Sequence, residues 1–217
     1  TLNVSDKSTF ADIGSGTGIF TEQLLNCGYK VFAIEPNDDM RKQAEKKLST
    51  YKKFVTVDGS ADDMRLPDNS VDYITCAQAF HWFDAETFKK ECKRVLKPNG
   101  KVIIVYNSRD KNADSSIALA DLHRRYNPDF HGFSNGIGLQ ECVDFFGGKC
   151  DIFRAANTQP YDRQGFINRV LSSSYSLKEN DDRYAEFLED INKIFDKFSA
   201  DGLIAIPTET IAYIGAV

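Results

Sequence analysis

A run of eight residues near the start of the chain has the composition of a nucleotide-binding turn. It covers residues 11–18 and reads Ala-Asp-Ile-Gly-Ser-Gly-Thr-Gly. Glycines at alternate positions lack a Cβ, so the backbone can approach a ligand closely. The next segment has a helical pattern, and a helix directs its free N–H groups at whatever lies before its first turn. In open α/β folds such a turn follows a strand and holds a nucleotide.

The spacing of these glycines distinguishes between the known classes of nucleotide-binding motif. The dinucleotide fingerprint G-x-G-x-x-G needs a glycine three residues after Gly16, where the chain has Ile19. The phosphate-binding P-loop ends in Gly-Lys-Ser or Gly-Lys-Thr, and the sequence contains neither triplet. The run is instead Asp-x-Gly-x-Gly-x-Gly, beginning at Asp12. This pattern resembles the first motif of class I S-adenosylmethionine (SAM) dependent methyltransferases.

An acidic residue closes the second expected strand. Glu35 follows the apolar run Val31–Ile34 and lies roughly twenty residues past the glycines, where a carboxylate can accept hydrogen bonds from both ribose hydroxyls. Glu35 matches the second motif of the resembled family, and Pro36 and Met40 are assigned to the same site. Glu35 alone fits NAD equally well, so the glycine spacing carries the discrimination.

Residues 59–64, Gly-Ser-Ala-Asp-Asp-Met, follow the third expected strand. In the resembled family this segment holds the adenine, largely through backbone N–H groups at the step from Ala61 to Asp62. The resemblance makes Asp62 the partner of the exocyclic amine, with Ser60 assisting, although many members have Asp where Ser60 stands. Composition alone describes a plain acidic loop, and that interpretation stays open.

Residues 77–83, Ala-Gln-Ala-Phe-His-Trp-Phe, leave the fourth expected strand. This run resembles the methyltransferase type 11 subgroup, which is similar to trans-aconitate methyltransferases and other small-molecule enzymes. Ala77 and Gln78 are assigned to the cofactor site. His81 is the candidate catalytic residue, able to take a proton from a hydroxyl or to donate a hydrogen bond to an acceptor carboxylate. A capping or packing role beside Trp82 is the alternative.

The expected cofactor site therefore gathers side chains and turns from four strand ends. For Asp12 two interpretations stay open, contact with the cofactor ammonium and bracing of the loop. The expected cofactor-binding residues are Asp12, Gly14, Ser15, Gly16, Gly18, Glu35, Pro36, Met40, Ser60, Ala61, Asp62, Ala77 and Gln78.

Methyl transfer from SAM is an in-line displacement at an activated cation, so alignment and exclusion of water suffice for an anionic acceptor. A base is needed only for an acceptor that is protonated at the working pH. The resemblance therefore implies an enzyme acting on a small organic acceptor, with a carboxylate or hydroxyl oxygen favoured over carbon or nitrogen. Its pocket is expected from residues 107–150 and 172–175. The candidates for binding an acidic group are Arg124, Arg125, Tyr126 and His131.

Strand and helix patterns alternate through the first half of the chain. Strands are expected at 9–13, 29–34, 54–57, 71–77 and 101–106, with a turn at 97–100 before the last. Alternation of this kind predicts a right-handed, doubly wound, mostly parallel Rossmann-like sheet, and the resemblance implies the seven-stranded methyltransferase type with a helical lid insertion. One domain, 1–217, is expected, with a cofactor-binding core (1–106), a lid and acceptor insertion (107–150) and a segment completing the sheet (151–217).

The second half is less regular. Helices are expected at 115–126, 139–146, 165–174 and 182–198. A strand is expected at 150–156, and strand-like residues at 203–214 are broken by Pro207.

Composition narrows the class of partner. Hydrophobic residues make up 41% and charged residues 27% of the chain, with a net charge of −5. This balance argues against nucleic acid or an anionic membrane as principal partner, and no apolar run approaches a membrane span. Five cysteines without a C-x-x-C pair predict reduced thiols in a cytoplasmic protein, with no disulfide framework and no metal site.

The chain opens almost directly on its first strand, whereas the resembled family carries upstream helices that cover the cofactor. We therefore expect that the chain lacks its true N-terminus. A monomer or a homodimer is expected. Two alternatives to the enzyme stay open: an NAD-type oxidoreductase, disfavoured by Ile19, and a non-catalytic SAM-binding domain.

Overall fold

The computed structural model describes residues 4–133 and 139–217. The chain divides into two compact units. Unit 1 comprises residues 1–106, 136–153 and 211–217, and unit 2 comprises residues 107–135 and 154–210. Each unit is treated by itself below.

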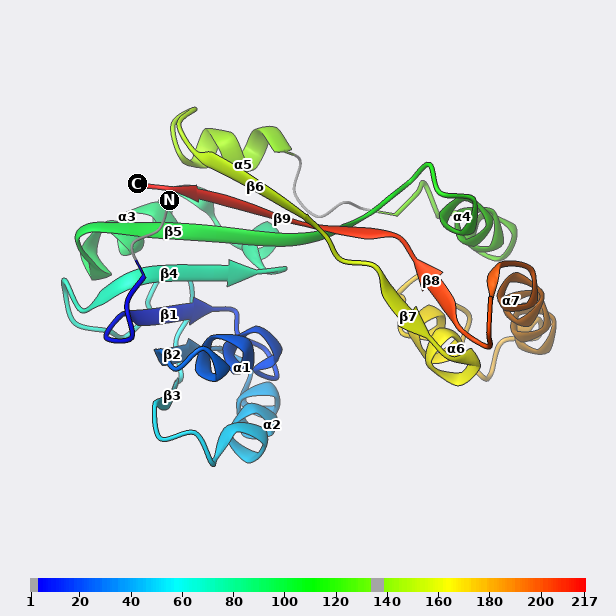
Figure 1. Ribbon diagram of the computed structural model, residues 1–217, viewed down its shortest axis with the longest axis horizontal. Helices are drawn as coiled ribbons and strands as arrows, with labels where there is room; N and C mark the ends of the chain where they lie inside the picture. The colour runs from blue at the N-terminus through cyan, green and yellow to red at the C-terminus, as the bar shows by residue number, and fades with distance from the viewer. Residues whose placement is uncertain (1–3, 134–138) are drawn as a thin grey trace. The chain divides into compact units, whose positions relative to one another are not determined.

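The described residues form a seven-stranded sheet, whose strands are shown in Figure 1. In spatial order they are β3 (Phe54–Val57), β2 (Lys30–Ile34), β1 (Thr9–Ile13), β4 (Val71–Ala77), β5 (Leu96–Arg109), β9 (Thr208–Gly215) and β6 (Asp151–Ala156). The pairs β3–β2, β2–β1, β1–β4 and β4–β5 are parallel. This arrangement confirms the expected doubly wound, mostly parallel sheet, and it brings the carboxyl ends of β1 to β4 to one edge.

Both faces of the sheet in unit 1 are covered because its strands alternate apolar side chains between two cores. One core contains Ile104 and residues from α3 (Ala85–Val95) and α5 (Leu139–Phe145). The other contains Ile103 and residues from α1 (Ile19–Asn26) and α2 (Asp38–Leu48). Successive residues of a strand point to opposite faces, so neighbouring isoleucines of β5 serve different cores.

Helix starts in unit 1 follow the capping residues in the sequence. The side chain of Asn37 accepts a hydrogen bond from the backbone N–H of Met40 at 3.0 Å, and Asp84 does the same for Thr87 at 2.9 Å. Each satisfies one of the donors that a first turn leaves free. The short 3-10 turn η1 (Phe80–Trp82) lies between β4 and α3.

The expected turn at residues 97–100 is wrong as a strand boundary. Strand β5 begins at Leu96 and continues through these residues, which form an irregularity in its pairing with β4. Asn99 takes a left-handed backbone conformation there, with φ 68°, and asparagine tolerates that region better than most residues. The residues are typical of a turn, but the strand pairs with β4 both before them, at Leu96, and after them, at Lys101.

Unit 2 is built around helices α4 (Asp114–Tyr126), α6 (Arg163–Leu171) and α7 (Tyr184–Phe198). Strands β7 (Gln159–Tyr161) and β8 (Ile204–Ile206) form an antiparallel pair within it. Its own core includes Phe166, Phe187 and Ile191. Helix α6 begins two residues before the expected start at Gly165, because the side chain of Asp162 caps it by accepting from the Gly165 N–H at 2.7 Å.

The segment expected as a lid, residues 107–150, is divided between the units. Helix α4 lies in unit 2, and α5 lies in unit 1. Part of α5 packs into the core of unit 1 through Cys142 and Phe145. No helix in the described part of the chain is long and apolar enough to cross a membrane.

Candidate cofactor site

The glycine turn after β1 is held by the end of β2. The carbonyl oxygen of Ile34 accepts hydrogen bonds from the backbone N–H groups of Gly14 and Ser15 at 2.9 and 3.1 Å. The carbonyl of Ser15 accepts from the N–H of Gly18 at 2.9 Å. Gly14, Gly16 and Gly18 have φ values of 66°, 55° and 79°. This left-handed region favours glycine, so the sequence pattern reflects a backbone requirement.

The three glycines meet different surroundings. A Cβ on Gly14 would lie 2.7 Å from the Cβ of Ala79, and one on Gly18 would lie 2.7 Å from the Leu48 side chain. A Cβ on Gly16 would have only the Met40 sulfur near it, at 4.0 Å. Gly14 and Gly18 therefore allow close packing of the turn on its neighbours. Gly16 is the one whose missing side chain leaves open space.

Glu35 joins the glycine turn to the end of β2. Its carboxylate accepts hydrogen bonds from the backbone N–H groups of Gly16 and Asn37, each at 2.9 Å. The side chain is buried. Each carboxylate oxygen keeps further acceptor capacity, so both can take a hydroxyl in addition. Pro36 and Met40 follow Glu35 as exposed residues at the start of α2.

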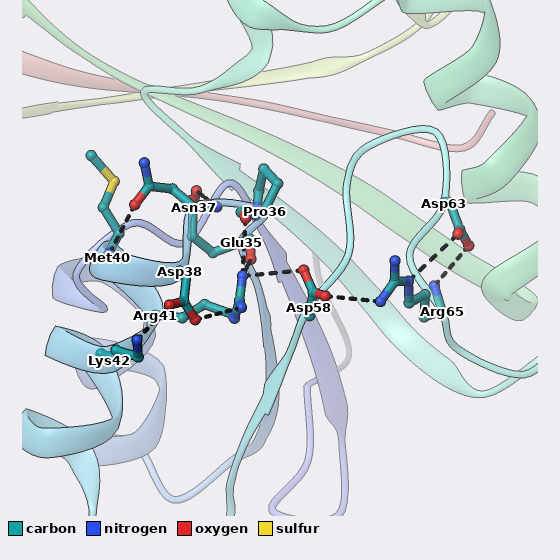
Figure 2. Close-up of polar contacts among 10 residues, drawn as sticks. All are labelled: Glu35, Pro36, Asn37, Asp38, Met40, Arg41, Lys42, Asp58, Asp63 and Arg65. Carbon is teal, nitrogen blue, oxygen red and sulfur yellow. Dashed lines mark hydrogen bonds and ion pairs between the residues drawn. The ribbon is translucent and has the colours of Figure 1, made fainter.

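Arg41, which carries no signal in the sequence, positions this strand end (Figure 2). Its guanidinium donates to the carbonyl oxygens of Glu35 and Pro36 at 2.9 and 3.0 Å. It also pairs with Asp38 at 3.0 Å and with Asp58, directly after β3, at 3.1 Å. Five donors in a planar fork suit arginine to such multiple contacts. One side chain thus links the ends of β2 and β3 to the first turn of α2.

Asp12 braces the turn from below. It is 1% exposed, and its two carboxylate oxygens accept hydrogen bonds from the hydroxyls of Thr21 and Thr75 at 2.6 and 2.8 Å. Burial raises its pKa to about 6, against the opposing effect of those two hydroxyls. These contacts favour the bracing interpretation over direct contact with a cofactor.

The loop after β3 is held by a short local network. The backbone N–H of Ser60 donates to the carbonyl of Asp63 at 2.9 Å, and the Ser60 hydroxyl donates to the Asp62 carboxylate at 2.6 Å. That hydroxyl lowers the pKa of Asp62, whose side chain is exposed. Ala61 is buried. Glu91 of α3 anchors the loop by accepting from the Met64 N–H at 2.9 Å.

The exit of β4 presents exposed polar groups. Gln78, directly after Ala77, is exposed and left-handed with φ 57°, and its N–H donates to Val105 at 2.9 Å. His81 is exposed, and its ring nitrogen Nδ1 lies 3.3 Å from the Tyr106 hydroxyl. The backbone N–H of His81 donates to the same hydroxyl at 3.1 Å. Tyr106, at the end of the fifth expected strand, carried no signal of this role.

Trp82 and Phe83 differ in their surroundings. Trp82 is 80% exposed, with its ring 4.9 Å from that of His81. Phe83 packs against the core of unit 1.

The candidates for an acidic group in unit 2 are mostly engaged elsewhere. Arg124 pairs with Asp121 at 2.5 Å. Arg125 and the Tyr126 hydroxyl both contact Asp190 at 2.8 Å. His131 is exposed. The sequence offered these residues as candidates by their type, but it could not show that carboxylates pair with Arg125 and Tyr126 in the folded chain.

The cofactor-site candidates all belong to unit 1 and lie at or after the carboxyl ends of β1 to β4. Direct contacts join Gly16 to Glu35 and Ser60 to Asp62, and the Met40 sulfur faces the open side of Gly16. Acceptors at Glu35, an exposed acidic loop and a glycine without a covering side chain fit a ligand with ribose hydroxyls and an amine. The residues present thus suit an adenosyl group.

Solved structures place this architecture in a known class. A SAM-dependent methyltransferase from Aquifex aeolicus aligns with a TM-score of 0.55 at 16% identity, over 98% of this chain and 85% of that one. A phosphoethanolamine N-methyltransferase 2 from Haemonchus contortus, solved with phosphomonomethylethanolamine and S-adenosylhomocysteine, aligns with a TM-score of 0.55 at 15% identity, over 99% of this chain and 50% of that one. The fold is that of class I SAM-dependent methyltransferases.

Sequence comparison identifies the family. The family model described as "Methyltransferase domain", of type 11, matches residues 11–104. An uncharacterized methyltransferase of Schizosaccharomyces pombe is 38% identical over 203 residues, which are 92% of this chain and 68% of that protein. The chain belongs to this methyltransferase family. It spans half the length of a second fission-yeast relative, with 37% identity over 134 residues.

Proposed function

We propose that this chain binds SAM at the carboxyl ends of β1 to β4 and transfers its methyl group to a small organic acceptor through a carboxylate or hydroxyl oxygen. The bond between Gly16 and Glu35 carries the proposal, because it sets an open turn and a ribose-type acceptor side by side. Family membership and the S-adenosylhomocysteine in the nematode enzyme support the choice of cofactor.

Each part of the ligand has a candidate partner in unit 1. Glu35 would accept from the ribose hydroxyls, the loop at Ser60 to Asp62 would hold the adenine, and the open face of Gly16 would pack on the amino-acid end. When bound, SAM supplies an electrophilic methyl group. The chain's own task is then to align the acceptor and exclude water.

Calorimetry with S-adenosylhomocysteine tests the cofactor assignment. We expect the wild-type protein to bind it, and Glu35→Gln to bind it about tenfold to a hundredfold more weakly, because hydrogen bonds to a charged group are worth about 1.5–3 kcal/mol. Glu45→Gln is the matched control, since Glu45 is an exposed residue of α2. Unfolding in urea shows whether each variant retains its fold.

Two outcomes would contradict the proposal. One is the absence of heat with SAM or S-adenosylhomocysteine at millimolar concentration, together with a nicotinamide fluorescence change on adding NADH. The other is cofactor binding without methyl transfer to any member of a panel of carboxylic acids, phenols and amines, which would favour a non-catalytic binding domain.

A further inference from the structure

Unit 2 contains buried polar atoms that have no partner. Across the described residues, four side-chain atoms are buried without a hydrogen bond, and three of them, Arg109 Nη1, Ser116 Oγ and His123 Nδ1, belong to unit 2. Native structures leave few such atoms, because each costs about 1–3 kcal/mol. Their concentration in one unit calls for a ligand or water that completes them.

Arg109 is a half-buried cation without a counter-ion. Within the described residues no carboxylate forms a salt bridge with it, whereas the candidates Arg124 and Arg125 are both paired. Its guanidinium lies 4.0 Å from the centre of the Phe133 ring. Burial and the nearby Arg169 lower its pKa to about 10, so it stays charged at neutral pH. A desolvated charge of this kind favours an anion beside it.

His123 supplies an acceptor in the same unit. It is 2% exposed on α4, and burial lowers its pKa to about 4, so the ring is neutral at pH 7. The backbone of Tyr175 acts in the opposite direction and raises the pKa of the ring, without outweighing burial. Nδ1 is buried and has no hydrogen-bond partner, and in the neutral ring with its proton on Nε2 the lone pair of Nδ1 is free to accept a hydrogen bond.

Aromatic rings join the two groups. Phe133 lies against Arg109, and its ring centre is 5.4 Å from that of His123. Phe130 is 5.2 Å from the His123 ring. Ser116 precedes His123 by two helical turns, so both side chains lie on the same face of α4. The surroundings are therefore one half-buried cation with the exposed Arg169 near it, one neutral acceptor and one hydroxyl, among aromatic rings.

We infer that Arg109, Ser116 and His123 form a binding site for a small organic carboxylate. Arg109 Nη1 donates to the carboxylate, and His123 Nδ1 accepts from a hydroxyl or amine of the same molecule. The aromatic rings around Arg109 favour an ion of low charge, because a phosphate dianion would bring a second negative charge among them. Only the further step, that this carboxylate is the methyl acceptor, rests on the proposed function.

The test is a titration of the full chain, labelled with ¹⁵N-histidine, with 3-hydroxybenzoate as the probe. The chain has three histidines, so the His123 signals can be assigned by comparison with His81→Asn and His131→Asn. We expect the Nδ1 resonance of His123 to move with 3-hydroxybenzoate and to stay in place with the neutral 3-hydroxybenzamide. Titrating the wild-type protein avoids reliance on a variant that fails to fold.

Calorimetry with the same probe adds the variants. We expect Arg109→Gln to weaken 3-hydroxybenzoate binding about tenfold or more, Arg109→Lys to recover part of the loss, and the control Arg124→Gln to leave it unchanged. The inference is overturned if neither 3-hydroxybenzoate nor acetate moves the His123 resonance, which would mean that water alone fills the site. Equal losses in Arg109→Gln and Arg124→Gln, or binding of inorganic phosphate as tight as that of the probe, would also overturn it.

S-adenosylhomocysteine binding separates this inference from the proposed function. We expect Arg109→Gln to bind S-adenosylhomocysteine like the wild-type protein, because the expected cofactor residues lie in unit 1. A wild-type protein that binds the probe but not S-adenosylhomocysteine refutes the proposed function and leaves the carboxylate site standing. One that binds S-adenosylhomocysteine but not the probe refutes only the carboxylate site.

Discussion

The backbone N–H of Gly16 donates to the carboxylate of Glu35 at 2.9 Å, across 19 residues of sequence. The glycine turn after β1 and the end of β2 are therefore one structure. The second carboxylate oxygen accepts from Asn37 at 2.9 Å, which fixes the side chain at the start of α2. A change in the backbone of the turn should therefore displace the Glu35 carboxylate, and a substitution of Glu35 should alter the turn.

Gly16→Ala should weaken S-adenosylhomocysteine binding more than it weakens the fold. A Cβ at this position meets nothing closer than the Met40 sulfur at 4.0 Å, so the cost to folding is the left-handed backbone alone, about 1–2 kcal/mol. The new methyl group projects into the space assigned to the ligand. We expect calorimetry to show a loss of tenfold or more. An alanine variant with wild-type affinity would show that the ligand does not pack on this turn.

Gly18→Ala should instead act on stability. Its Cβ would lie 2.7 Å from the Leu48 side chain, in addition to the left-handed backbone at φ 79°. Overpacking a core typically adds about 1–3 kcal/mol. Gly28→Ala is the matched control, because Gly28 has φ 84° and nothing within 4 Å of its Cβ. Urea unfolding should show Gly18→Ala as the more destabilised of the two, and equal losses would argue against the packing role.

The sequence predicted those parts of the site that local chemistry determines. Left-handed turns need glycine, and a helix start needs a capping side chain such as Asn37, so both leave a readable pattern. Glu35 was predicted from its place after the apolar run Val31–Ile34 and from its match to the second motif of the family. The alternating pattern of strands and helices was sufficient to predict the parallel sheet.

Contacts between distant segments could not be predicted in this way. The separate roles of Gly14 and Gly18 depend on Ala79 and Leu48, which only the folded chain brings near. Arg41 looks like any exposed helix arginine until its partners after β2 and β3 are placed. Arg125 pairs with Asp190, which lies 65 residues away in the sequence. The sequence therefore could not show that this arginine already has a carboxylate partner.

Arg41→Met should destabilise the ends of β2 and β3 that support the candidate cofactor site. The Arg41 side chain donates to two backbone carbonyls and pairs with Asp38 and Asp58. Losing the donor to the part-buried Glu35 carbonyl costs about 1–3 kcal/mol, so we expect lower stability in urea and severalfold weaker S-adenosylhomocysteine binding. Lys42→Met is the control, because that exposed ion pair with Asp38 should contribute under about 1 kcal/mol. Similar effects of the two substitutions would contradict the positioning role.

Asp12 should make stability rise as the pH falls. Its pKa is about 6 in the folded protein against 3.8 for an ordinary aspartate, so the folded state binds this proton more tightly than the unfolded chain does. The ionised carboxylate therefore costs stability above pH 6, and that cost disappears between about pH 6 and pH 4. The shift corresponds to about 3 kcal/mol.

Asp12→Asn isolates this contribution. The difference in unfolding free energy, wild type minus Asp12→Asn, should be larger at pH 4 than at pH 7 by a few kcal/mol, measured in urea across that range. Asp39→Asn, at an exposed position in the first turn of α2, controls for the loss of a surface carboxylate. A difference that stays constant with pH would show that Asp12 is not buried as a weak acid.

Tyr106 should determine which nitrogen of His81 carries the proton. The Tyr106 hydroxyl already accepts from the His81 backbone N–H at 3.1 Å, and His81 Nδ1 lies 3.3 Å away. Burial raises the pKa of Tyr106, so the hydroxyl keeps its proton and needs an acceptor. Among the residues described, Nδ1 is the acceptor within reach, which leaves the proton of neutral His81 on Nε2.

Nε2 of the exposed His81 would then be a donor suited to an acceptor carboxylate and not a base. Nitrogen-15 spectra of the wild-type protein, recorded with the His81 ring in its neutral form, should show that Nδ1 of His81 is unprotonated and hydrogen-bonded. In Tyr106→Phe that hydrogen-bond shift should vanish and the population protonated at Nδ1 should rise, with His131 unchanged as the internal reference. A wild-type Nδ1 that carries the proton would reverse the assignment, since Nε2 would then present the lone pair that a general base requires.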